Sequence, residues 1–393
     1  MHIYKLSDYF EITSSKRVFK SEWTQDGIPF YRAREIVKIS KNEKFKDPIF
    51  ISNNHYQEVA KKYGVPKIGD LLVTGVGTLG ISLIIENEKP FYFKDGNIIW
   101  FKKKEEINSK YVQHYLNSPI VQKMINNKIG ATVKTFTISD ANNLQIPVPS
   151  LQEQEKIVER LDEVFENISK KLKIDKLRKE ELNTLSKSIY DELFNFNSNN
   201  LTTLSNLVEF ENGDRGRNYP SKKYRVKSGI PFINAGNFNL EGEISEEKME
   251  YISDEHYNKL SGGKVRKNDF LLCIRGSLGK FALNNRYGKA AIASSLVIIR
   301  PNKLDNIEML DKYFRSSLFK KQITEKSGGT AQPNLGANQL KDFLIPSSLS
   351  KEALYRARKI DILLKQYLEN NQKVIEKVNL LKTSLLNKEF SYE

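Results

Sequence analysis

The residues of this sequence that could recognise a ligand are mostly arginines, lysines and side-chain amides, gathered in a few loop-like stretches. Arginine, asparagine and glutamine can each make two hydrogen bonds to the edge of a purine base, and lysine neutralises phosphate groups. Any one of these residues could equally belong to a solvated charged surface, but the set as a whole favours contact with DNA. The predicted DNA-contacting residues are Arg32, Arg34, Lys38, Lys41, Lys44, Lys134, Thr135, Arg215, Arg217, Lys222, Lys223, Arg225, Arg275, Gln332 and Asn334.

The segment 75–80 matches the GxGxxG pattern of dinucleotide-binding loops, and Asp95 stands about 20 residues further on, where an acid that binds ribose is expected. In such a fold the glycine loop must open a helix. Here residues 81–85 and 97–101 have the composition of strands, and the second half of the chain has Ile274 in place of the first glycine. We therefore predict a tight turn between two strands, which could bring backbone close to a DNA phosphate.

No catalytic, cofactor-binding or metal-binding residues are predicted in this chain. The sequence has no GxxxxGK[ST] loop for a nucleoside triphosphate and no Pro-Pro-aromatic motif for methyl transfer to adenine. Asp70 and Asp269 each stand alone before a strand and are interpreted as turn-forming residues. The single cysteine and four histidines lack metal-ligand spacing. His55 and His256 are interpreted as packing residues.

The charge of the chain favours a polyanionic partner. Lys and Arg number 63 against 48 Asp and Glu, which gives a net charge of +15. An ordinary basic protein from an AT-rich genome is the alternative that composition leaves open. One cysteine, no apolar run long enough to cross a membrane and no signal-like start lead us to expect a cytoplasmic protein without a membrane partner.

The chain contains an internal duplication, and the offset between matched residues of the two copies drifts only from 202 to 196 residues. The matched segments keep their order along the whole length. Five of them are Gly27–Phe30 with Gly229–Phe232, Ile51–Tyr56 with Ile252–Tyr257, Asp70–Gly80 with Asp269–Gly279, Gly130–Thr132 with Gly328–Thr330, and Ile146-Pro147 with Ile345-Pro346.

Each copy begins with a globule and ends with a long helix. The first parts carry strand-like segments with Gly, Asn, Asp and Pro between them, and short helices are expected within 110–126 and 310–325. The second parts contain neither Pro nor Gly, and Ser150 with Glu153 forms a capping box. We predict recognition domains at 1–148 and 199–347, followed by long helices at 149–198 and 348–393.

The two long helices are predicted to pair as an antiparallel coiled coil, since they are too long to bury in a compact domain. Packing of each helix on its own globule is the alternative. The fold class is therefore α+β, with two similar mixed α/β domains separated by two long helices and a pseudo-twofold repeat. The predicted helix–helix seam is Ile157, Leu161, Val164, Ile168, Leu182, Leu185, Ile189, Ile360, Leu364, Tyr367, Asn371, Val374, Val378, Leu381 and Leu385.

The join from Thr132 into the first long helix, TVKTFTISDANNLQIPVPSLQEQEKIVERLD, resembles that of type I restriction–modification specificity subunits. The Gly-Ile-Pro-Phe segment, the Asp-Leu-Leu…Gly-Thr-Leu-Gly turn and the duplication are similar to that family too. The second copy departs from the pattern, because Ile345–Leu349 is not followed by Glu-Gln.

The resemblance implies a non-catalytic chain that binds double-stranded DNA. Each globule would read one half of a bipartite, asymmetric site, and the helices would set the spacer between the halves. Two methyltransferase subunits would dock on the helices, and motor–nuclease subunits would complete the complex. S-adenosylmethionine, ATP and Mg²⁺ are expected on those partner subunits and none of them on this chain. The alternatives are a stand-alone nuclease or methyltransferase with two DNA-binding arms, and a DNA-binding regulator.

Overall fold

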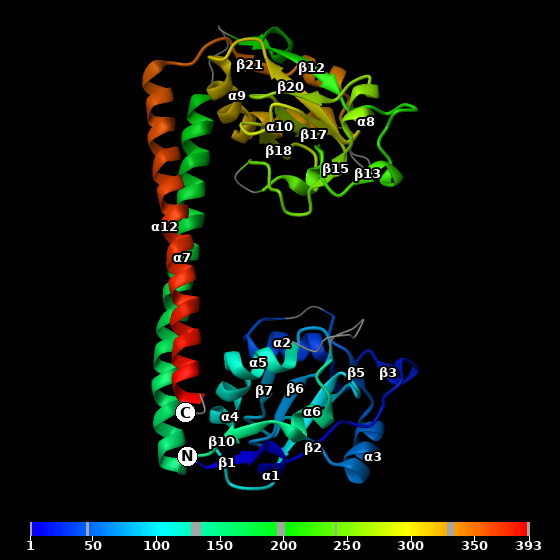
Figure 1. Cartoon of the computed structure of the whole chain (residues 1–393), viewed down its shortest axis with the longest axis vertical. Helices are drawn as coiled ribbons and strands as arrows, with labels where there is room; N and C mark the ends of the chain where they lie inside the picture. Colours follow the sequence, from blue (N-terminus) through cyan, green and yellow to red (C-terminus); the bar gives the residue numbers. More distant parts are fainter. Residues whose placement is uncertain are drawn as a thin grey trace. The chain divides into compact units, whose positions relative to one another are not determined.

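The computed structural model describes residues 2–44, 47–126, 135–194, 201–239, 242–327 and 334–390. It divides into two compact units, and each unit combines one globule with segments of both long helices (Figure 1). Unit 1 comprises Met1–Asp175 with Asn371–Glu393, and unit 2 comprises Lys176–Asn370. The four segment boundaries expected from the sequence stay a prediction, because each compact unit takes in parts of both long helices.

The globule of unit 1 is built on an antiparallel sheet of four strands in the order β2-β9-β6-β7. These strands are β2 Phe10–Thr13, β6 Leu71–Thr74, β7 Ser82–Ile84 and β9 Ile98–Lys103. A smaller sheet has the order β3-β5-β4-β8, in which β4 and β8 are parallel. Its strands are β3 Trp23–Thr24, β4 Ile28–Tyr31, β5 Phe50–Ile51 and β8 Tyr92–Phe93. The ends of the domain meet where β1 (Ile3–Lys5) pairs with β10 (Gln145–Pro147).

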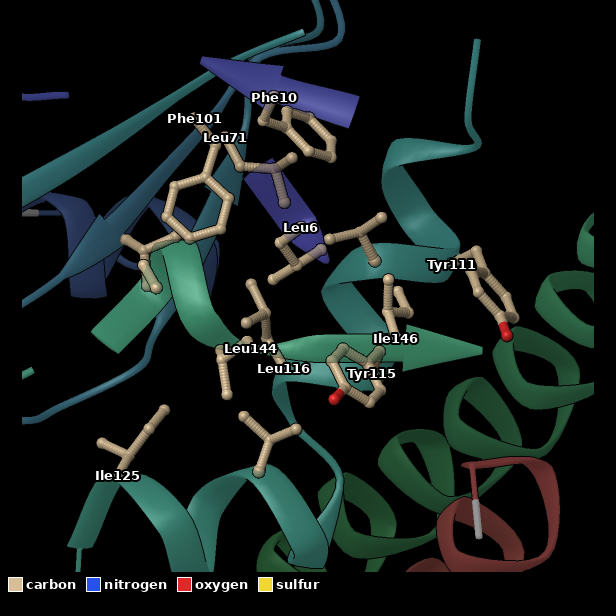
Figure 2. Packing of buried hydrophobic residues seen from close by; sticks show 14 of the residues in the cluster. Leu6, Phe10, Leu71, Phe101, Tyr111, Tyr115, Leu116, Ile125, Leu144 and Ile146 are labelled. Carbon is tan, nitrogen blue, oxygen red and sulfur yellow. The ribbon is translucent and has the colours of Figure 1, made fainter. Parts of the chain in front are cut away.

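Helices cover one face of the larger sheet and close the core of unit 1. Phe10, Leu71 and Phe101 point from the strands toward Leu116 and Ile146, and all five are at most 1% exposed (Figure 2). The stretch 110–126 contains two helices, as Pro119 begins the second one. The helices of this globule are α1 Leu6–Tyr9, α2 Ala33–Ser40, α3 Asn53–Tyr63, α4 Ser109–Leu116, α5 Pro119–Asn126 and α6 Ile138–Asn143, with the 3₁₀ turn η1 Lys20–Glu22.

The globule of unit 2 repeats this topology, with one additional strand, β16, at an edge of its smaller sheet. Its larger sheet has the order β12-β20-β17-β18, from Val208–Asn212, Leu296–Pro301, Phe270–Cys273 and Phe281–Leu283. The smaller sheet, β13-β15-β14-β19-β16, consists of Arg225–Val226, Glu250–Ile252, Ile230–Ile233, Ala290–Ile292 and Lys264–Val265. The pair β11 Leu201–Thr203 with β21 Leu344–Pro346 closes the domain. The described helices are α8 Asp254–Lys259, α9 Asn306–Arg315, α10 Ser317–Lys326 and α11 Ala337–Lys341, with η2 Leu204–Asn206, η3 Lys222–Tyr224 and η4 Ala235–Asn237. The predicted internal repeat is therefore confirmed at the level of strand order.

The two long helices each begin directly after a serine that caps them. Helix α7 spans Leu151–Leu193, and the N–H of Glu153 donates to the Ser150 hydroxyl at 3.3 Å. Helix α12 spans Lys351–Phe390 and has the same cap, because the N–H of Ala353 donates to Ser350 Oγ at 3.1 Å. The missing Glu-Gln therefore does not prevent this helix from starting at the equivalent place.

Segments of α7 and α12 run antiparallel within each unit. In unit 1, Arg160 pairs with Glu389 at 2.7 Å, and the Lys382 amine lies over the Phe165 ring. In unit 2, the Tyr190 hydroxyl donates to Asp361, and Arg356 lies 3.5 Å from Glu192. Residue numbers rise along α7 as they fall along α12 in both units, which confirms antiparallel pairing.

Most predicted seam residues face the helix pair or the adjoining globule, and two do not. Leu185 and Leu381 are 49% and 47% exposed, so their assignment to the seam is wrong. Ser186 is buried in place of Leu185, and Lys382 packs on Phe165 in place of Leu381. A helix with 3.6 residues per turn drifts away from a strict seven-residue repeat, and this drift moves the contact by one residue. Buried seam residues are Ile157, Leu161, Ile168 and Ile360; half-buried ones are Val164, Leu182, Ile189, Leu364, Tyr367, Asn371, Val374, Val378 and Leu385.

Candidate nucleic-acid interface

The Gly75–Gly80 segment is a tight turn between strands β6 and β7, as predicted. The N–H of Gly80 donates to the Thr74 carbonyl at 2.8 Å, and the Thr74 hydroxyl accepts from the N–H of Ile81 at 3.0 Å. Gly77 and Gly80 have φ values of +81° and +74°, which favour glycine. The segment leads into β7 and not into a helix, so it lacks the helix N-terminus on which a dinucleotide phosphate would sit.

In both globules a residue from later in the chain forms a β-bridge with this turn, so that three predicted DNA contacts, Thr135, Arg275 and Asn334, lie at it. In unit 1, Val76 forms a β-bridge with Thr135, beside a cavity of about 410 Å³ that both residues line. In unit 2, Arg275 forms the equivalent bridge with Asn334, and its Nε donates to the Asn334 side chain at 3.4 Å. Both side chains are exposed, so an arginine and an amide are presented together at the turn.

The basic residues after Phe30 form a stripe on helix α2. Arg34, Lys38 and Lys41 are spaced by four and three residues, and they share a face opposite the buried Ile36. Lys44 follows the helix and is exposed. Arg32 is more buried, because its side chain is 24% exposed and its guanidinium donates to the buried Glu35 at 2.9 Å.

The carboxylate of Glu35 is an internal anchor for this helix. Burial opposes its ionisation, but hydrogen bonds from Arg32 and Arg34 outweigh burial and lower the pKa of Glu35. The side chain of Glu35 is 2% exposed, whereas that of Arg34 is 57% exposed. Arg34 can therefore face a ligand while it helps to neutralise Glu35, and Arg32 serves mainly the packing of α2.

The basic run of the second globule lies between β12 and β13. Arg215, Arg217, Lys222 and Lys223 are exposed. Arg225 is not available in the same way, since its side chain is only 15% exposed, pairs with Glu250 at 3.1 Å and covers the Phe232 ring at 3.7 Å. The structure thus gives Arg225 a packing role, whereas the sequence predicts a DNA contact.

The paired acids and histidines hold loops within each globule. Asp70 accepts from the Trp100 indole at 2.8 Å, and Asp269 accepts from the Arg300 guanidinium at 2.8 Å. Both also accept from the backbone N–H three residues before them, as turn-forming residues do. The His256 ring packs against Tyr224 in a tilted arrangement with ring centroids 4.6 Å apart, which agrees with a packing role. Across the described ranges, no group of three His, Cys, Asp or Glu side chains is arranged to hold a metal.

Sequence reasoning missed one basic loop and placed two residues that the structure does not describe. Lys134 and Gln332 lie outside the described residues. The loop from Ser14 to Glu22 carries exposed Lys16, Arg17 and Lys20, and it precedes β3 as the run 215–224 precedes β13. The offset of 202 residues that relates Gly27 to Gly229 also relates Lys20 to Lys222. The duplication therefore contained the signal for this loop.

Comparison with known proteins identifies the same family along nearly the whole chain. The model of the type I restriction modification DNA specificity domain matches twice, at residues 1–179 and 199–380. A Haemophilus influenzae protein named as a type I restriction enzyme specificity subunit is 32% identical over 169 residues, which span 42% of this chain and 40% of that protein. The type I restriction enzyme EcoBI specificity subunit of Escherichia coli is 25% identical over 327 residues, 74% of this chain and 67% of that protein.

A solved structure shares the fold. It comes from work on complex assembly and conformational transition of the type I R-M system, and its TM-score is 0.66 at 15% identity. The superposition covers 98% of this chain and 96% of the other. In the described part of the chain, no helix is long and apolar enough to span a membrane.

Proposed function

Because the chain belongs to the type I restriction modification DNA specificity family, we propose that it is the DNA-binding specificity subunit of a type I restriction–modification enzyme. Each globule would read one half of a bipartite, asymmetric site. The observation that carries this proposal is the duplication, since the family domain matches twice, the larger sheets of both globules have the same strand order, and both globules carry a basic loop at the same place. Two different sets of exposed side chains on one scaffold suit two different half-sites.

The long helices would set the spacer and dock partner subunits. They are strongly charged, yet each unit exposes large apolar side chains on them: Ile174 and Leu380 in unit 1, and Leu177, Tyr355 and Ile362 in unit 2. Exposed apolar side chains on otherwise charged helices are available to pack against a protein partner. The expected partners are two methyltransferase subunits, with motor–nuclease subunits completing the restriction complex.

The chemistry would then belong to those partners. S-adenosylmethionine, ATP and Mg²⁺ would be bound by the methyltransferase and motor–nuclease subunits, and this chain would work in the cytoplasm. Its own contribution would be affinity and register on DNA, from phosphate contacts by lysines and base contacts by residues such as Arg275 and Asn334.

The purified chain, incubated with S-adenosylmethionine, Mg²⁺, ATP and duplex DNA, tests this division of labour. We expect DNA binding that weakens steeply with salt, because phosphate contacts release counterions, and neither cleavage nor methylation. Adding the methyltransferase subunit should produce methylated adenines at one bipartite sequence. Robust turnover by the chain alone would instead support a stand-alone nuclease or methyltransferase, and binding without methylation in the complete complex would support a regulator.

A further inference from the structure

The loop from Ser14 to Glu22 combines a backbone that is hydrogen-bonded to neighbouring strands with exposed basic and aromatic side chains. We call these residues the anchored loop. It connects β2 to β3 through the turn η1, at the β3 edge of the smaller sheet of unit 1 (Figure 1). None of its basic side chains was predicted to contact DNA.

Hydrogen bonds to neighbouring strands hold the backbone of the anchored loop. Ser14 Oγ donates to the Ile98 carbonyl at 3.0 Å, and Ser15 Oγ donates to the Phe93 carbonyl at 2.7 Å. The N–H of Lys16 donates to the Tyr92 hydroxyl at 3.0 Å, and Val18 is buried at 6% exposure. These contacts remove much of the conformational entropy that a free loop would lose when it binds a ligand.

The outward side chains of the anchored loop include three cations and one aromatic ring. Phe19 is 60% exposed, and Lys16 and Lys20 are exposed in the same loop. The Lys16 amine lies 5.5 Å from the centre of the Tyr63 ring. The Arg17 side chain is 66% exposed, and its Nε pairs with Asp95 at 3.0 Å, which orients the guanidinium. A large apolar ring held in water on a basic loop costs solvation energy without a fold-stabilising return, so the combination indicates a ligand that is both anionic and aromatic.

The second globule presents the same chemistry at the equivalent turn. Lys222 and Lys223 are exposed in η3, and Tyr224 at its end is 42% exposed with the Lys223 amine 4.8 Å from its ring. The loop that leads to this turn is held by Asp214, which accepts from the N–H and the hydroxyl of Ser261, each at 2.9 Å. The aromatic residue has moved along the turn, but a basic turn with an exposed ring occurs in both copies.

We propose that the anchored loop is a DNA contact in which Lys16, Arg17 and Lys20 neutralise phosphates and Phe19 packs against the base stack as an apolar wedge. The η3 turn makes the corresponding contact for the other globule through Lys222, Lys223 and Tyr224. Apolar side chains inserted at a base step are a known means of bending a duplex. This inference rests on the proposed function, since it adds contact residues to the same DNA-binding role.

Equilibrium binding of the full chain to a fluorescent 40-base-pair duplex, measured across a salt series, tests the charges. The slope of log K against log salt is negative, and the variant Lys16→Gln/Arg17→Gln/Lys20→Gln should reduce its magnitude by about two to three, at about 0.9 per phosphate contact. The matched control is Lys156→Gln/Lys170→Gln/Lys173→Gln on α7, which removes the same charge from exposed helix positions and should change the slope by less than one. Equal slopes for the two variants would overturn the phosphate contacts.

The wedge is tested separately by Phe19→Ala, with Ile68→Ala as a control at a similarly exposed apolar residue, 58% exposed. Phe19→Ala should weaken DNA binding at least fivefold with an unchanged salt slope. It should also reduce the rise in fluorescence that binding causes in a duplex containing 2-aminopurine. Thermal unfolding of both variants should match the unmodified chain. Unchanged affinity and fluorescence would overturn the wedge. The wedge would also be overturned if Phe19→Ala abolished binding to anionic phospholipid vesicles and left DNA binding intact. If the unmodified chain binds no DNA, the proposed function itself fails.

Discussion

The imidazole Nε2 of His114 lies 2.8 Å from the carboxylate of Asp162 and joins helix α4 of the first globule to the long helix α7. In the second copy Lys312 of α9 pairs with Asp361 of α12. The offsets between the partners are 198 and 199 residues, so the same contact occurs twice, with a histidine in the first copy and a lysine in the second. In each unit this pair connects a globule to its long helix.

The two contacts should respond differently to pH. Burial lowers the pKa of His114 below its ordinary value, and the hydrogen bond to Asp162 opposes this only in part. For Lys312, burial also disfavours the charge, but Asp311 and Asp361 outweigh it and raise the pKa of Lys312. Lys312 thus stays charged near neutral pH, whereas His114 does not.

We predict that His114 makes the first unit less stable in mild acid. Its pKa is lower in the folded state, so the unfolded chain binds more protons once the pH falls below about 6.5. Stability that is present at pH 7.5 is then lost as the pH falls toward 5.5. Urea unfolding should show a smaller loss over this range for His114→Gln than for the unmodified chain. His2→Gln, at an exposed position, is the control, and an identical pH dependence in all three proteins would contradict the prediction.

We predict that the glycine of the second Gly-Ile-Pro-Phe segment cannot be replaced without a large loss of stability, because of its backbone conformation and the backbone that lies close to it. Gly229 has φ +147°, and a Cβ there would lie 2.5 Å from the carbonyl oxygen of Ile252, a residue of the paired strand β15. Gly229→Ala should therefore destabilise unit 2 by about 3 kcal/mol or more, from strain and overpacking together.

The control for this substitution is Gly276→Ala. Gly276 also has a positive φ, +75°, but a Cβ there meets nothing within 4 Å, so only the conformational cost of about 1–2 kcal/mol should remain. Chemical denaturation of both variants measures the difference. Equal losses would show that the close approach to Ile252 is relieved at no cost.

The internal repeat and the long helices were predictable because the signals for them are local or repeated. Alternating apolar residues, the Ser150 cap and the absence of Pro and Gly are written in short windows of sequence. Because the sequence is duplicated, the pattern in each window can be compared with the equivalent window of the other copy. For this reason the residues alone distinguish the turn at Gly75–Gly80 from a dinucleotide-binding loop.

The residues that were misjudged depend on contacts that no short window contains. Arg225 belongs to a basic run in the sequence, but its neighbour Glu250 lies on another strand and Phe232 lies beneath it. Leu381 satisfies the heptad pattern, yet drift of the real helix turns it outward and brings Lys382 onto Phe165. In both cases, contacts between residues far apart in the sequence determine where the side chain lies.

Exchange of one globule should change one half-site only. Each globule has its own sheets, and its buried cluster is completed by long-helix residues that the other cluster does not share. Residues 1–147 can therefore be replaced by those of a related specificity protein without altering the second globule. Mapping of methylated adenines, with the methyltransferase subunit present, should show one half-site changed and the other retained. A change in both half-sites would contradict the assignment of one half-site to each globule.

Insertion of four residues after Lys173 should lengthen the spacer of the DNA site. Four residues add roughly 6 Å of helix and a rotation of about 40°, because one turn takes 3.6 residues. Base pairs rise about 3.4 Å each, so the spacer should grow by one or two base pairs while both half-sites stay the same. Lys173 is exposed on α7, which places the insertion away from buried seam residues. A two-residue insertion is the control, since it rotates the following helix by about 200° and should disrupt assembly. Methylation mapping of the variant complex reads the spacer directly, and an active four-residue variant with the original spacer would show that the helices do not determine it.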